Sequence, residues 1–163
     1  SRTRYPIRFD FRTGEKWDGC IHCHFPGCGN IFSFGDLFFI FNAYNKGVVA
    51  GNMGSFSYGL TTSDGIYFLV AEDRWIYQQW VMNFYPGQQA DMEEIRWSER
   101  DFRDFYGIGL DTPPEEAEKN FLKYITENFM GLGLMKYNPG TNKFEKKKYS
   151  MYDGEFYTED CPE

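Results

Sequence analysis

A nine-residue stretch near the N-terminus constrains this chain more than any other feature. Residues 20–28, Cys-Ile-His-Cys-His-Phe-Pro-Gly-Cys, contain three of the four cysteines and both histidines of the 163-residue sequence. Pro26, Gly27 and Gly29 disfavour a regular helix there, because proline lacks an amide hydrogen and glycine is a helix breaker. The stretch is therefore expected to form a tight loop that is either cross-linked or bound to a ligand.

Disulfide bonding is the first interpretation of this cluster. Four cysteines are an even number, with Cys20, Cys23 and Cys28 close together and Cys161 near the C-terminus. A bridge from the cluster to Cys161 would close a loop of over 130 residues. Such a bridge contributes roughly 4–5 kcal/mol by the chain-entropy argument. We therefore expect cysteines to join the two ends of the chain, with a second, local bridge whose partners the sequence does not select.

This interpretation also predicts a compartment. Disulfide bonds persist in oxidising surroundings, such as the extracellular space, the periplasm, an organelle lumen or the intermembrane space. The chain begins at Ser1 without a signal-type apolar segment, which fits either a mature form after processing or a trimmed chain, and the oxidising compartment predicts the mature form.

The second interpretation is covalent haem attachment. The pattern Cys20-x-x-Cys23-His24 resembles the attachment motif of c-type cytochromes. The resemblance implies that Cys20 and Cys23 form thioethers with haem and that His24 ligates the iron, while Cys28 and Cys161 are left to form one disulfide bond. The function would then be that of a monohaem electron-transfer protein. The resemblance covers five residues, and the rest of the sequence does not show the pattern of a small helical cytochrome. Candidates for a sixth iron ligand are Met53 and His22.

The third interpretation is a structural zinc site in a reducing compartment. Thiolates of Cys20, Cys23 and Cys28, with His24 or Cys161 as the fourth ligand, would make a tetrahedral set. The second Cys-x-x-Cys or histidine pair of the common zinc motifs is missing from the sequence.

The charge of the chain is negative and unevenly distributed. The net charge is −7, which argues against nucleic acid as a partner because phosphates require clustered lysine and arginine. Residues 91–118 contain ten acidic residues and three arginines, so this segment alone accounts for a net charge of −7. An acidic helical face can dock a basic protein partner. The candidate docking residues are Asp91, Glu93, Glu94, Glu99, Asp101 and Asp104.

Aromatic residues are the other compositional feature. The chain has 17 Phe, 12 Tyr and 4 Trp, more than a core of this size needs, so some are expected at a surface that meets partners. A membrane-associated complex is one setting for such partners. The chain itself has no apolar run of the ~20 residues that a membrane-spanning helix requires.

The fold class predicted is α+β, with a single compact domain over residues 1–163, a small irregular antiparallel β portion and about four helices. Local signals mark the elements. They are an extended basic arm (1–19), a helix capped by Asp36 (36–47), a strand (65–71), a helix (73–85), a helix capped by Ser98 (97–106), a helix capped by Thr112 and ending at Gly131, a hairpin (134–137 and 143–146) and an acidic tail (150–163).

No motif for a catalytic nucleophile, a phosphate loop or a dinucleotide site is present. The sequence therefore predicts a non-catalytic, disulfide-stapled accessory or interaction subunit of a larger assembly, with no cofactor. Haem-based electron transfer and structural zinc binding are the alternatives.

Overall fold

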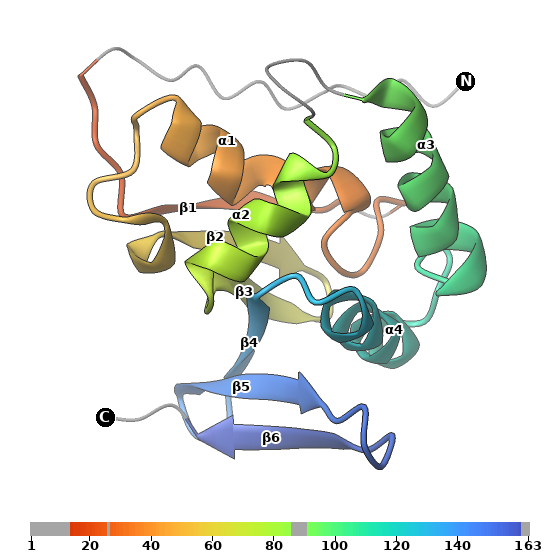
Figure 1. Ribbon diagram of the computed structural model, residues 1–163. Coiled ribbons are helices and arrows are strands. Elements are labelled where there is room, and N and C mark those ends of the chain that lie inside the picture. The colour runs from red at the N-terminus through yellow and green to blue at the C-terminus, as the bar shows by residue number, and fades with distance from the viewer. Residues whose placement is uncertain (1–13, 26, 86–90, 161–163) are drawn as a thin grey trace.

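A six-stranded sheet is the central element of the computed structural model (Figure 1), which describes residues 14–25, 27–85 and 91–160. The strands lie side by side in sequence order, and the first pair is parallel while the others are antiparallel. The strands are β1 (Gly19–Cys23), β2 (Ser57–Thr62), β3 (Gly65–Ala71), β4 (Leu132–Asn138), β5 (Lys143–Tyr149) and β6 (Phe156–Asp160).

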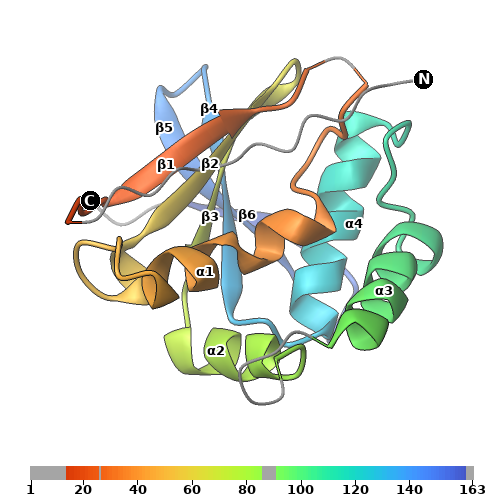
Figure 2. The same ribbon diagram turned by 90° about the horizontal axis from the view of Figure 1, so that it is seen from above.

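The helices gather on one side of this sheet, as Figure 2 shows, with α3 at the outer margin. The α-helices are α1 (Phe39–Asn45), α2 (Arg74–Met82), α3 (Met92–Arg100) and α4 (Pro114–Glu127). Short helical turns η1 (Phe34–Phe38) and η2 (Met53–Ser55) flank α1, and a π-helical turn, η3 (Asp101–Phe105), continues α3. Among the described residues, none of the helices has the length and apolar character that crossing a membrane demands.

The core lies between the sheet and the helices, where alternate strand residues point. Tyr58 and Leu60 on β2, Tyr67 and Leu69 on β3, and Leu134 on β4 are all almost fully buried. Alternation of buried and exposed residues is what a sheet covered on one face requires. Each large apolar side chain buried in this way contributes about 1.5–3 kcal/mol.

The sheet and the four α-helices form one α+β domain, so the predicted α+β class, the single domain and the four helices are confirmed.

The β portion is larger and more regular than predicted. The sequence suggested a small antiparallel part, whereas the sheet has six strands and is mixed, because β1 pairs with β2 in parallel. A parallel pair needs a crossover, and residues 24–56 supply it through η1, α1 and η2. Residues 20–23 thus belong to a strand, not to a loop. Within the predicted acidic tail, residues 156–160 form β6 on the edge of the sheet.

Two predicted helix starts are displaced. The helix predicted at residues 36–47 begins earlier, because Ser33 is the N-cap of η1 and Asp36 is the third residue of that turn. The helix predicted at Ser98 begins at α3, where the Asp91 carboxylate accepts hydrogen bonds from the backbone amides of Glu93 and Glu94 at 3.0 Å. The Asp91 side chain caps α3, whereas at η1 the Asp36 carboxylate accepts a hydrogen bond from the backbone amide of the N-cap residue Ser33. In both cases the predicted cap residue lies inside the helix.

The expected disulfide bonds are not formed among the cysteines that the structure describes. Cys20, Cys23 and Cys28 are free thiols. Cys161, the predicted partner from the C-terminal end, lies outside the described residues, as does most of the predicted basic arm 1–19. The joining of the two chain ends through cysteines is therefore not supported.

Gly131, which connects α4 to β4, allows a close approach that a side chain would prevent. Its φ is +64°, and a Cβ atom built there would lie 2.5 Å from the carbonyl oxygen of Asp73 and 2.9 Å from the amide nitrogen of Tyr77. We predict that Gly131→Ala destabilises the protein by roughly 3 kcal/mol or more, from left-handed backbone strain plus overpacking against backbone.

Gly47 provides the matched control. Its φ is +67°, yet nothing lies within 4 Å of the added Cβ. Gly47→Ala should therefore cost only the strain, about 1–2 kcal/mol. Urea unfolding of both variants measures the difference, and equal losses of stability would contradict the packing of Gly131 against the start of α2.

Candidate metal centre

Three side chains that can ligate a metal converge at the edge of the sheet. They are His22 from β1, His24 just after β1, and Asp36 from η1. One potential ligand atom from each lies within 4.8 Å of the others. Among the described residues, this is the sole group of three or more His, Cys, Asp or Glu side chains arranged so closely.

Strand geometry brings the two histidines together. Side chains two apart on a strand share a face. The strand pairing continues past Cys23, because the backbone amide of His24 donates to the carbonyl of Thr61 at 2.9 Å. His22 is buried, and its ring stacks on Tyr58 with the ring centroids 4.8 Å apart. The parallel pairing of β1 with β2 thus fixes both imidazoles on the helix side of the sheet.

Hydrogen bonds hold the Asp36 carboxylate in place. The backbone amide and the hydroxyl of Ser33 both donate to Oδ2 at 2.7 Å, and the hydroxyl of Tyr58 donates to Oδ1 at 2.9 Å. Burial, and then the nearby Asp36 charge, raise the pKa of Tyr58, so its hydroxyl keeps the proton that it donates. A carboxylate has about four lone-pair sites. The three hydrogen bonds use both lone pairs of Oδ2 and one of Oδ1, so the second lone pair of Oδ1 is left for another partner.

Two backbone carbonyls determine which ring nitrogen of His22 and of His24 carries a hydrogen. His22 Nδ1 lies 2.9 Å from the carbonyl oxygen of Gly59, and His24 Nδ1 lies 2.8 Å from that of Gly29. A carbonyl oxygen can only accept, so each Nδ1 must carry a hydrogen and donate it. In a neutral ring the other nitrogen, Nε2, then has no hydrogen and presents a lone pair.

These two lone pairs face each other. The Nε2 atoms of His22 and His24 are 3.2 Å apart, and they lie 3.6 and 3.9 Å from oxygens of Asp36. A hydrogen bond between the rings would require one of them to carry a second proton and a positive charge. Burial is the main cause that lowers the pKa of His22, which favours its neutral form. The Nε2 lone pairs of the two histidines and the carboxylate of Asp36 thus lie close together, and a cation between them would be attracted to all three.

The cysteines predicted as ligands do not join this group. Cys23 is exposed and lies on the opposite face of β1 from Cys20, because strand side chains alternate. Burial raises the pKa of the Cys20 thiol to about 12, so that it stays protonated. Of the predicted zinc set only His24 belongs to the cluster. Haem attachment to Cys20 and Cys23 stays a prediction, although it would require thioethers on both faces of a strand.

Sequence reasoning missed Asp36 as a candidate ligand and considered His22 only as a sixth ligand of a haem iron, not as a partner of His24 in one metal site. The signal for His22 was its alternation with His24, which shows a shared face only if the segment is a strand. Asp36 had no local signal as a ligand, since a carboxylate near a helix start is usually a cap. Asp36 comes close to the two histidines only because the chain crosses over after β1 and passes through η1.

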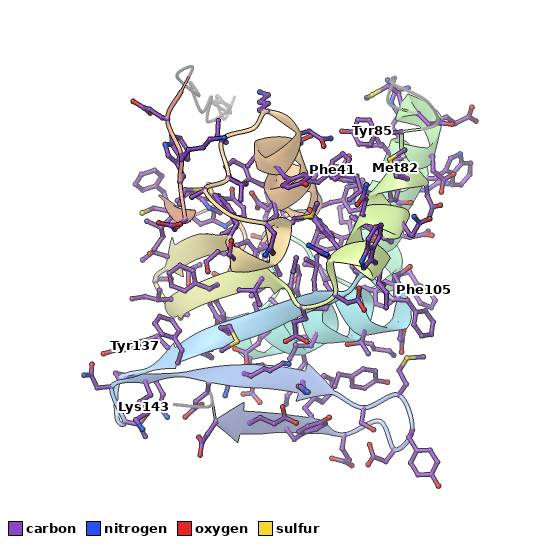
Figure 3. All side chains as sticks on the ribbon, turned by 60° about the vertical axis from the view of Figure 1, so that its left-hand side comes forward. Phe41, Met82, Tyr85, Phe105, Tyr137 and Lys143 are labelled. Carbon is purple, nitrogen blue, oxygen red and sulfur yellow. The ribbon has the colours of Figure 1, made fainter. Side chains whose placement is uncertain are left out.

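The predicted docking residues form a different surface. Asp91, Glu93, Glu94, Glu99, Asp101 and Asp104 follow one another along α3 and η3 and are all exposed. Asp104 is paired with Arg103, at 2.9 Å. Phe102 anchors this stretch to the core, with its ring 4.9 Å from that of Tyr124. Phe105 points outward at the margin of the helix layer, as Figure 3 shows, and is 78% exposed.

Comparison with known proteins finds no matching family, curated relative or solved structure. The assignment of function therefore depends on the geometry of these residues.

Proposed function

We propose that this protein is a metal-binding domain that holds a divalent transition-metal ion of the zinc class through His22 Nε2, His24 Nε2 and Asp36 Oδ1. The observation that supports the proposal best is the pair of facing Nε2 atoms 3.2 Å apart, in rings whose Nδ1 atoms are already committed as donors. A cation between them replaces repulsion of lone pairs with two ligand bonds.

The separations fit the size of such an ion. Zinc lies about 2.0–2.1 Å from imidazole nitrogen, so two ligands of a tetrahedral ion are about 3.3 Å apart. The nitrogen pair is at 3.2 Å, and Asp36 Oδ1 is 3.6 Å from His22 Nε2. The carboxylate lies 3.9 Å from His24 Nε2, through Oδ2, so it would have to move toward His24 by about half an ångström or more to complete the set.

The surrounding hydrogen bonds are those that metal-binding histidines usually have. A ligating histidine almost always donates its second ring N–H to a carbonyl or carboxylate, which fixes the orientation of the ring. Gly59 and Gly29 provide carbonyl oxygens in this role. Two imidazole nitrogens suit zinc, copper, iron or nickel, whereas calcium and magnesium prefer oxygen ligands.

The bound ion would stabilise the fold. It would connect β1 to η1 across the loop between them, and an ion that binds only the folded state adds about 2.7 kcal/mol at 100 times its dissociation constant. For a domain of this size that is a rise in Tm of about 5–10 °C.

We predict that zinc binds the metal-free protein with a stoichiometry of one at this site and raises its Tm, and that chelator reverses the rise. His24→Gln and Asp36→Asn should each reduce the affinity by at least tenfold, because each removes a ligand or its charge. Isothermal titration calorimetry and thermal unfolding measure both effects.

Cys23→Ser is the matched control. Cys23 lies between the two histidines in sequence but on the opposite face of the strand, so its loss should leave the affinity unchanged. If Cys23→Ser abolished zinc binding while His24→Gln had no effect, the cysteine-based set would be correct and the proposed site would be wrong.

A second function, as an interaction subunit, is favoured by the surface of α3. No residue of α3 is buried, and Trp97 is 54% exposed with the Arg100 guanidinium 3.7 Å from the centre of its ring. A helix this poorly covered, with acidic side chains around an aromatic ring, suits a partner segment rich in lysine and arginine.

We predict that a lysine-rich peptide binds this face, changes the fluorescence of Trp97 and is released by salt, because exposed charges are screened. Neutralising Glu93, Glu99 and Asp101 to their amides should weaken the binding at least fivefold. Neutralising Asp18, Glu116 and Glu155, which are equally exposed but lie elsewhere, should have a smaller effect. Equal effects of the two sets would show attraction by net charge alone and contradict docking at α3.

A further inference from the structure

We propose that the metal centre has an open coordination position, where bound water exchanges with a small anionic ligand that donates through oxygen or nitrogen. This inference depends on the proposed metal-binding function. The ion would then connect β1 to η1 and would also be accessible to a ligand from solution.

An open position is indicated first by the number of protein ligands. Zinc in structural sites has four protein ligands, whereas sites that bind water or substrate have three and leave one position open. Within the described part of the chain, three side chains converge: His22, His24 and Asp36. The thiols of Cys20, Cys23 and Cys28 are not in this group.

The exposure of the ligands is the second argument. The His22 side chain is 4% exposed, whereas those of His24 and Asp36 are each 14% exposed. The group is therefore more exposed on the side formed by His24 and Asp36 than on the side of His22. Two residues that follow His24 in the chain are also exposed: Phe25, at 72%, and Cys28. His22 forms the inner wall, against Tyr58.

Charge selects the class of the ligand. Two neutral imidazoles and one carboxylate around a divalent ion leave a net charge of +1, which attracts an anion. The neighbouring hydroxyls of Ser33 and Tyr58 already donate to Asp36, so the metal itself must be the main point of attachment. In the exchange a lone pair of the anion forms a bond to the metal, the metal–water bond breaks, and neutral water leaves.

Cobalt(II) in place of zinc makes the exchange visible, because its visible absorption depends on its ligands. We would load the full-length protein with cobalt, titrate it with azide, and repeat the titration with inorganic phosphate. The expected result is the appearance of cobalt absorption bands with one equivalent of metal, followed by a saturable change of their positions and intensities with azide.

Thiol variants test for a hidden fourth ligand. Cys28→Ser and Cys161→Ser should keep both the cobalt bands and their response to azide. Loss of a near-ultraviolet thiolate-to-cobalt band in either variant would show that a cysteine closes the site and would overturn the inference. His24→Gln should lose the cobalt bands altogether.

The outcomes separate this inference from the proposed function. If cobalt binds but neither azide nor phosphate changes the spectrum, the site is closed, and the open position is disproved while metal binding stands. If no cobalt bands appear in the wild-type protein, the metal-binding function itself is disproved.

Discussion

The parallel pairing of β1 with β2 is the constraint on which the candidate site depends. It places His22 beside Tyr58 and brings its Nδ1 within hydrogen-bonding distance of the Gly59 carbonyl. Parallel strands cannot be joined by a hairpin, so the chain must cross over before β2. That crossover begins with the loop whose Gly29 carbonyl orients His24, and then enters η1, which provides Asp36. One pairing therefore positions all three side chains.

The burial of His22 costs more free energy than the burial of an apolar side chain. His22 is the one polar or charged residue that is buried among the described residues, and burying an imidazole costs free energy unless its polar atoms have partners. Its Nδ1 has a partner, while its Nε2 faces another nitrogen. Such local conflict between chemistry and packing is common at functional sites, which is consistent with a role in binding a cation.

The sequence predicted elements whose signals are local. The helices near residues 36–47 and 73–85, the strand at residues 65–71 and the hairpin of β4 and β5 all depend on periodicity and turn residues that act within a few positions. Where prediction failed, the deciding contact was distant. Pro26 and Gly27 favour a loop for the segment that contains Cys20, whereas its pairing with β2 makes it a strand. Because a loop has no regular alternation, the sequence did not predict that His22 and His24 share a face, and the predicted zinc set contained three cysteines.

The central claim is that nitrogen and oxygen atoms, and not sulfur, hold the ion. X-ray absorption at the zinc edge of the zinc-loaded protein tests this most directly, because zinc lies about 2.0–2.2 Å from imidazole nitrogen or carboxylate oxygen and about 2.3 Å from thiolate sulfur. We predict a first shell of nitrogen and oxygen alone, with the outer scattering of two imidazole rings. Sulfur in the first shell, or scattering from fewer than two imidazoles, would contradict the site formed by His22, His24 and Asp36.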